Sequence, residues 1–166
     1  MPVLRCLIVL STLSMLALFG APARAQDGKI AIEKFNHSEW TKGIFSEAVT
    51  VTGIGNAKMI FLAGVGAEDE NGPRGNIRNP GDFAAQCHYA YDKIKRLLEK
   101  QGATMGDIVK MTTYLTDMRN QADYGKCRVE AFGNNALPAH TLVNISQLAW
   151  PGMMVEIDAT AVVPLK

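Results

Sequence analysis

Hydrophobic and polar positions follow two different periods along this chain. Alternating or continuous apolar positions predict β-strands over residues 48–52, 58–65, 107–116, 140–148 and 153–163. Apolar positions at helical spacing predict one helix between the N-cap Asp82 and Gly102, and a second helix over residues 121–132. The order β-β-α-β-α-β-β is typical of an α+β fold, in which a mixed sheet carries both helices on one face.

A cluster of turn residues, Gly53-Ile54-Gly55-Asn56, separates the first two predicted strands. Glycine and asparagine favour tight turns, so this cluster predicts a β-hairpin that joins residues 48–52 to residues 58–65. The polar segment before the hairpin, residues 26–42, is expected to form an N-terminal arm or a short strand.

The last two strands combine apolar and ionisable residues. On strict alternation, one face presents a set of β-branched residues that can pack under the helices: Val143, Ile145, Val155 and Ile157. The opposite, helix-free face would present a mixed set: His140, Leu142, Asn144, Met154, Glu156 and Asp158. Charged groups are rarely buried unless they are paired or used, so this face is expected to form a pocket or to be covered by another subunit. Lys110 and Tyr114 are expected on one side of their strand, facing solvent, an interface or the pocket.

The first 25 residues have the layout of a secretory signal peptide. Arg5 precedes an uncharged apolar run over residues 7–19, and Ala23-Arg24-Ala25 is a small-x-small cleavage signal. We therefore expect residues 1–25 to be removed, and residues 43–166 to form one domain of an exported protein, periplasmic or secreted. No stable membrane association is expected after cleavage.

Charge argues against nucleic acid as a partner. Of the 17 basic residues, Arg5 and Arg24 lie in the leader, so the mature chain has 15 basic against 16 acidic residues and a net charge of −1. Nucleic-acid binding depends on clustered lysine and arginine, and the sequence contains no basic run.

Cys87 and Cys127 are the cysteines that remain after cleavage, and both fall on the apolar sides of the predicted helices. They could pair in an oxidising compartment, but two buried thiols acting as small apolar residues are the favoured interpretation. Histidines and acidic residues show no metal-ligand spacing, and the glycine pairs do not extend to a nucleotide-binding loop. The sequence predicts no metal and no cofactor.

Six segments, in order, resemble one known family: GIFSEAV at 43–49, FLAG at 61–64, GATMGDIVKMTTYLTD at 102–117, EAF at 130–132, LPA at 137–139 and VEIDA at 155–159. Together they are similar to the RidA/YjgF family, also called L-PSP, across nearly all of the mature chain. The resemblance implies a chorismate-mutase-like fold and a homotrimer with clefts between subunits. It also implies hydrolysis of 2-imino acids and their enamine tautomers to 2-keto acids and ammonia.

Matched to the motifs, the catalytic glutamate of that family falls on Glu156, and the glycine that lets a ligand approach the backbone falls on Gly64. The aromatic residue of the entry segment falls on Phe45, where a tyrosine is usual. The arginine that binds the substrate carboxylate falls on His140. Arginine offers a permanently charged fork, whereas histidine is mostly neutral at pH 7, so we expect a retained pocket with a changed ligand.

Alternatives remain at each of these positions. Glu156 could be a catalytic acid/base or a member of an interface ion pair. His140 could bind a ligand or transfer a proton, or it could be a structural histidine satisfied by Glu156 or Asp158, and a neighbouring carboxylate would raise its pKa. Asp158 is expected to be structural. At the level of the molecule, an imine/enamine deaminase competes with a non-catalytic trimeric protein that binds a small ligand, and ribonuclease activity is disfavoured.

Overall fold

The computed structural model of the protein describes residues 29–35, 43, 46 and 48–165. Its strands are β1 (Ala31–Phe35), β2 (Ala48–Thr52), β3 (Ala57–Phe61), β4 (Val65–Gly66), β5 (Ile108–Leu115), β6 (Ala139–Asn144) and β7 (Val155–Pro164). Its α-helices are α1 (Phe83–Lys100) and α2 (Gln121–Phe132). Short 3-10 turns, η2 (Ile54–Asn56), η3 (Met105–Asp107) and η4 (Met118–Asn120), join some of them.

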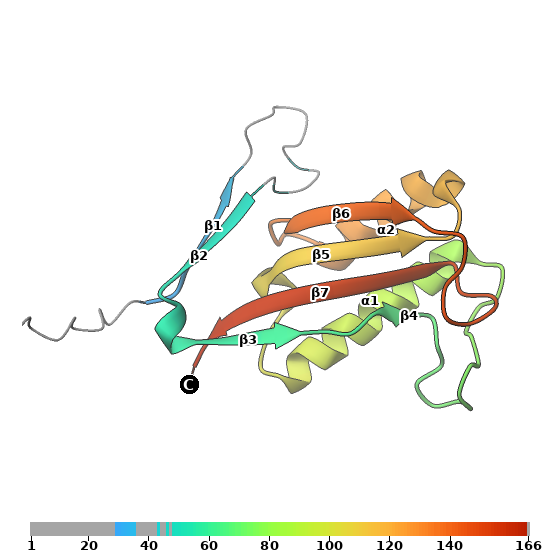
Figure 1. Ribbon diagram of the computed structural model, residues 1–166, viewed down its shortest axis with the longest axis horizontal. Coiled ribbons are helices and arrows are strands. Elements are labelled where there is room, and N and C mark those ends of the chain that lie inside the picture. Colours follow the sequence, from blue (N-terminus) through green and yellow to red (C-terminus); the bar gives the residue numbers. More distant parts are fainter. Residues whose placement is uncertain (1–28, 36–42, 44–45, 47, 166) are drawn as a thin grey trace, which may run out of the picture.

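The main sheet has five strands in the order β3-β7-β5-β6, with β4 also paired to β7. Strands β5 and β6 run parallel, and α2 connects them; the other pairs are antiparallel. Figure 1 shows α1 and α2 behind the same side of this sheet. The predicted α+β fold, with a mixed sheet and two helices on one face, is confirmed.

Helix α1 forms where the sequence pattern predicts it. The Asp82 side chain accepts a hydrogen bond of 2.9 Å from the Ala85 amide, which caps the first turn. Residues at helical spacing, among them Cys87, Ile94 and Leu98, are fully buried against the sheet. Gly102, in the left-handed region at φ 73°, follows the end of the helix, a conformation that glycine adopts without strain.

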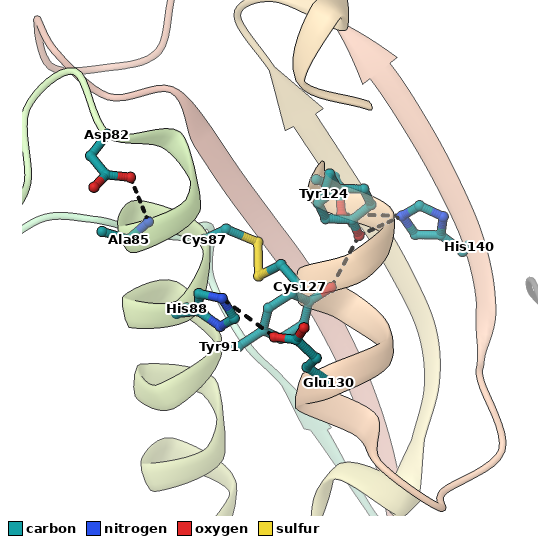
Figure 2. The surroundings of a disulfide bond; sticks show 10 residues. Asp82, Ala85, Cys87, His88, Tyr91, Tyr124, Cys127, Glu130 and His140 are labelled. Atoms are coloured by element: carbon teal, nitrogen blue, oxygen red, sulfur yellow. Dashed lines mark hydrogen bonds and ion pairs between the residues drawn. A yellow bond between two sulfur atoms is a disulfide. The ribbon is translucent and has the colours of Figure 1, made fainter. Parts of the chain in front are cut away.

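A disulfide joins the two helices. The Sγ atoms of Cys87 in α1 and Cys127 in α2 are 2.13 Å apart, and the bond links positions separated by 40 residues (Figure 2). The favoured interpretation of two free thiols is therefore wrong. Sequence spacing gives no information on the 6.4 Å separation of the two Cα atoms, which results from how the helices pack on the sheet.

The predicted hairpin between β2 and β3 is also wrong. Strand β2 pairs with β1, and β3 pairs with β7. Gly53, at φ 73°, leads into the 3-10 turn η2, which redirects the chain between β2 and β3. The β1–β2 ribbon extends away from the main sheet (Figure 1), and Lys34 Nζ ties it back by a hydrogen bond of 2.5 Å to the Ala136 carbonyl.

The two faces of the sheet differ in burial. Val155, Ile157 and Ala159 of β7 lie in the core under the helices, whereas the residues between them are half-buried on the helix-free face. No helix among the residues described is long and apolar enough to cross a membrane.

Candidate functional site

Glu156 lies at the centre of the helix-free face, near the start of β7. It is opposite Tyr114 on β5 and opposite Gly66 on β4, so strands on both sides fix its backbone. Its neighbours Val155 and Ile157 are fully buried on the other face, and this anchors the strand so that the glutamate must project away from the helices. The sequence placed Glu156 on this face correctly.

Gly64 lies directly against the Glu156 side chain. A Cβ atom added at Gly64 would be 2.3 Å from Oε1 and 2.6 Å from Cδ of Glu156, closer than real atoms approach. Only a glycine at position 64 therefore allows the carboxyl group to occupy its present position. The structure brings together Gly64 and Glu156, two of the residues that the sequence analysis selected.

A partly buried lysine, Lys93, holds the turn that carries Gly64 and β4. Lys93 Nζ donates to the carbonyl oxygens of Gly66, at 2.9 Å, and Glu68, at 2.8 Å, and it reaches Glu68 Oε2 at 3.2 Å. The same Glu68 oxygen accepts a hydrogen bond from the Gly66 amide. Because Lys93 comes from α1, the helix and the β4 edge are locked together beside Glu156.

A second tie from α1 positions the beginning of β7. The fully buried Gln86 donates from Nε2 to the Gly152 carbonyl at 2.8 Å, and its Oε1 accepts from the Met154 amide at 2.9 Å. Two opposed hydrogen bonds from one side-chain amide fix the chain immediately before Glu156.

Two other carboxylates, those of Glu68 and Asp158, lie close enough to Glu156 to affect its pKa. Partial burial raises the pKa of Glu156, and the nearby Glu68 and Asp158 raise it further. The Tyr114 hydroxyl donates to Asp158 Oδ2 at 3.2 Å, and the charge of Asp158 raises the pKa of Tyr114. A carboxyl group with a raised pKa is better suited to exchange protons near neutral pH.

A shallow hollow of about 330 Å³ opens beside the Glu156 carboxyl group. Two carboxylates and a tyrosine border it together with an aliphatic and amide wall from the segment after β6. Its lining residues are Tyr114, Ile145, Gln147, Leu148, Ala149, Glu156 and Asp158. The arrangement offers an acid/base group, a hydrogen-bonded carboxylate and apolar surface to one small molecule.

His140 does not share the hollow, contrary to the prediction from alternation. In β6, His140 pairs with the buried Met111 of β5, and Val143 pairs with Tyr114, so His140 lies on the helix-covered face. Figure 2 shows His140 turned toward α2. The face assigned to β6 was wrong because this edge strand is half-buried on both sides, so alternation alone does not distinguish its faces.

The partners of His140 come from the core and not from carboxylates. Its Nε2 is 2.9 Å from the Tyr124 hydroxyl and 3.2 Å from Thr113 Oγ1, and its ring stacks on Tyr124. Its Nδ1 is 2.8 Å from Nη1 of Arg128. A guanidinium only donates, so Nδ1 accepts and the proton of a neutral ring is on Nε2.

This environment opposes a charge on His140. Burial, followed by the positive charges of Arg128 and Lys110, lowers the pKa of His140 from 6.5 to about 3. The condition for a raised pKa of His140, a neighbouring carboxylate, is therefore not met. Of the two alternatives, the geometry matches a histidine satisfied within the fold, with Tyr124, Thr113 and Arg128 in place of the expected acids.

Phe45, the fourth residue selected from the sequence, lies outside the described residues, as do residues 1–25. The sequence pattern did not predict Glu68 as a neighbour of Glu156. It also did not predict Tyr124 and Arg128 as partners of His140. The spacing of Tyr124 and Arg128, four residues apart on one helix, was the available signal. Glu68 comes close only through the turn before α1, which no sequence pattern encodes.

The described residues contain no group of three or more histidine, cysteine or acidic side chains that could hold a metal ion.

Known structures share this architecture. A Rid family protein of unknown function, YyfB from Yersinia pestis, superposes with a TM-score of 0.71 at 24% identity, over 80% of this chain and 98% of that one. TdcF of Escherichia coli, solved with bound serine, gives 0.57 at 24% identity, over 72% of this chain and 87% of that one. At these identities the likeness shows the fold.

Sequence comparison adds closer relations. A RutC family protein of Pyrococcus abyssi is 34% identical over 119 residues, covering 72% of this chain and 86% of its own. The 2-iminobutanoate/2-iminopropanoate deaminase of Escherichia coli K12 is 35% identical over 86 residues, covering 50% of this chain and 66% of its own. The family model described as endoribonuclease L-PSP matches residues 39–163. The chain therefore belongs to the L-PSP family, also known as the RidA/YjgF family.

Proposed function

We propose that this protein is a small-molecule hydrolase that deaminates imines or enamines, with Glu156 as the acid/base residue. The observation that carries the proposal is the Glu156 carboxyl group, held against Gly64 beside an open hollow, with a raised pKa. The similarity to a 2-iminobutanoate/2-iminopropanoate deaminase supports the same reaction class.

The proposed reaction needs one base that later acts as an acid. Ionised Glu156 takes a proton from water while the water oxygen bonds to the carbon of the protonated imine, which gives a neutral carbinolamine. The protonated Glu156 then returns that proton to the nitrogen. Glu156, ionised again, takes the hydroxyl proton as the C–N bond breaks, so ammonia leaves and a carbonyl compound remains. A pKa above the usual value for glutamate reduces the free-energy difference between protonated and ionised Glu156 near neutral pH.

We further propose that the chain lacks the carboxylate-binding arginine of the deaminase branch. Motif matching assigns that position to His140, whose two ring nitrogens are engaged by Arg128, Tyr124 and Thr113. This favours a second candidate function, a non-catalytic protein of the same fold that binds a small ligand in the hollow.

We also propose that the protein forms a homotrimer and that it is exported from the cytoplasm. A homotrimer whose subunits meet at the helix-free faces would cover the exposed Phe61, which is 72% accessible, and enclose the hollow. Export to the periplasm or outside the cell is supported by the signal-like residues 1–25 and by the Cys87–Cys127 disulfide, a bond typical of oxidising compartments.

Ribonuclease activity, which the family description mentions, is disfavoured. Glu156 and Asp158 line the hollow and Glu68 lies near Glu156, and their charge would repel a phosphodiester backbone.

The test is an assay of carbonyl release by the mature protein. Amino-acid oxidase generates 2-iminopropanoate and 2-iminobutanoate in situ, flavin amine oxidase generates imines of primary amines, and the carbonyl product is followed with and without protein. We expect acceleration of at least one imine class, reduced about 100-fold in Glu156→Gln. Equal rates with and without protein across both classes would leave the non-catalytic alternative.

A further inference from the structure

We infer that the hollow beside Glu156 selects imines that carry a positive charge and no carboxylate, such as iminium ions derived from primary amines, over 2-imino acids. The inference rests on the proposed function for the reaction, and the charges and surfaces of the hollow support the selectivity.

The charged groups that line the hollow are acidic. Glu156 and Asp158 border it, and Glu68 is near enough to raise the pKa of Glu156. None of the described residues that line this hollow is basic. A substrate carboxylate would therefore meet two like charges at close range, with no compensating cation among the described residues that line the hollow in its own protomer.

Two lysines in this region, Lys93 and Lys110, make contacts outside the hollow. Lys93 approaches from α1 and places its ammonium on the Gly66 and Glu68 carbonyl oxygens and on Glu68 Oε2. Lys110 is on the helix-free face, but it pairs across the sheet with Thr160 and donates to Thr141 Oγ1 at 2.7 Å. It borders a separate hollow on the other side of Asp158.

The other residues that line the hollow are suited to a substrate with an apolar group next to a cationic nitrogen. Ile145, Leu148 and Ala149 supply aliphatic surface, and Tyr114 supplies an aromatic ring, which attracts cations at its face. The hydrogen bond from the Tyr114 hydroxyl fixes the Asp158 carboxylate, so one acceptor is already oriented for an N–H donor.

The same charges favour the reactive form of such a substrate. Nearby carboxylates stabilise a protonated imine and raise its pKa, so a larger fraction is present as the electrophilic iminium. Water adds to the iminium carbon as Glu156 takes one proton. That proton then passes to nitrogen, and Glu156 transfers the hydroxyl proton to the departing ammonia as the C–N bond breaks, so an aldehyde and an ammonium ion form and the charge and the atoms balance.

A matched pair of substrates tests the selectivity. Amino-acid oxidase converts phenylalanine to 2-imino-3-phenylpropanoate, and a flavin amine oxidase converts phenethylamine to 2-phenylethanimine, which differs by the missing carboxylate. We expect the mature protein to accelerate hydrolysis of 2-phenylethanimine at least about tenfold more than that of the imino acid. Asp158→Asn should reduce this ratio about tenfold, and Glu130→Gln, which removes the same charge from the exposed surface of α2, should leave it unchanged.

A binding measurement keeps the inference testable if no hydrolysis occurs. Calorimetry with phenethylammonium and 3-phenylpropanoate should give heat for the ammonium ion alone, with affinity that falls in Asp158→Asn and at high salt. Tighter binding of the carboxylate, binding of neither ion, or preferential hydrolysis of the imino acid would overturn the inference. Loss of all hydrolysis with retained ammonium selectivity would overturn the proposed function alone.

Discussion

Two ionisable residues on strands of the same sheet have opposite environments. Glu156 projects from the helix-free face beside a hollow, with burial and neighbouring acids raising its pKa. His140 lies on the helix-covered face between Arg128 and Tyr124, with burial and positive charge lowering its pKa to about 3. The register of the strands places Glu156 on the helix-free face beside the hollow, and it places His140 on the helix-covered face, where its ring nitrogens contact groups of the fold.

The contact between Gly64 and Glu156 predicts a selective loss of activity. In Gly64→Ala, the new methyl group would overlap the Glu156 carboxyl group, which lies at the end of a flexible side chain and can rotate away. We expect imine hydrolysis to fall at least about tenfold, whereas the unfolding free energy changes by less than about 1 kcal/mol. Gly55→Ala is the control, because nothing lies within 4 Å of an added Cβ there. Unchanged activity in Gly64→Ala would contradict the close packing.

The environment of His140 predicts a pH-dependent stability. The folded protein holds a neutral ring down to a pKa of about 3, whereas the unfolded chain binds a proton near 6.5, so stability is greatest above 6.5 and falls as pH decreases toward 3. The contribution of this residue approaches about 1.4 kcal/mol per pH unit inside that window. Urea unfolding should be measured between pH 7 and pH 4, and the unfolding free energy plotted against pH. The slope of this plot should be smaller in His140→Gln than in the wild type, and unchanged in His88→Gln, which alters an exposed histidine. Equal slopes in all three proteins would contradict a neutral buried His140.

At the scale of elements, the two helices could be predicted because their signals are local. The Asp82 cap, the burial pattern of α1 and the limits of α2 all agree with the sequence pattern. The partner of β3 could not be predicted, since the turn after Gly53 is compatible with pairing to β2, and only the long β7 provides the competing edge. The face of the edge strand β6, and therefore the position of His140, depended on its register with β5.

The link between α1 and α2 predicts a measurable stabilisation. A disulfide that closes a loop of 40 residues restricts the unfolded chain by about 4 kcal/mol on the loop-entropy scale. Reduction, or the pair Cys87→Ala and Cys127→Ala, should lower the unfolding free energy by about 2–4 kcal/mol in urea titrations. The double variant should not respond to reductant. Two alkylatable thiols in the unreduced, unfolded mature protein would show that the bond is absent.

At the scale of the whole molecule, the proposed self-association rests on the helix-free face of the sheet, where Phe61 is exposed. Two residues of the candidate site, Glu156 and Gly64, could be predicted from the family motifs. The surroundings of Glu156 could not, because Glu68 comes near it, and the segment at 145–149 reaches the hollow, only in the folded chain.

The proposed trimer makes Phe61 a discriminating position. Phe61 pairs with Thr160 and is 72% exposed on the helix-free face, whereas the 51% exposed Val129 is on α2, which lies on the other side of the sheet. Sedimentation of the mature protein should give three times the mass of one chain. Phe61→Asp should lower that mass and Val129→Asp should preserve it, since a charge is costly only where a subunit covers it. A wild-type protein that sediments as a single chain would contradict the assembly.

The pH dependence of kcat/KM for imine hydrolysis tests the central claim, that Glu156 activates water, most directly. The wild type should lose activity toward acidic pH with one ionisation whose pKa lies above the usual 4.5 of glutamate, because burial, Glu68 and Asp158 all oppose the charge. Glu156→Gln should lose about 100-fold in rate together with that acidic limb. A variant that retains the wild-type rate, or the same limb, would show that another group performs the chemistry.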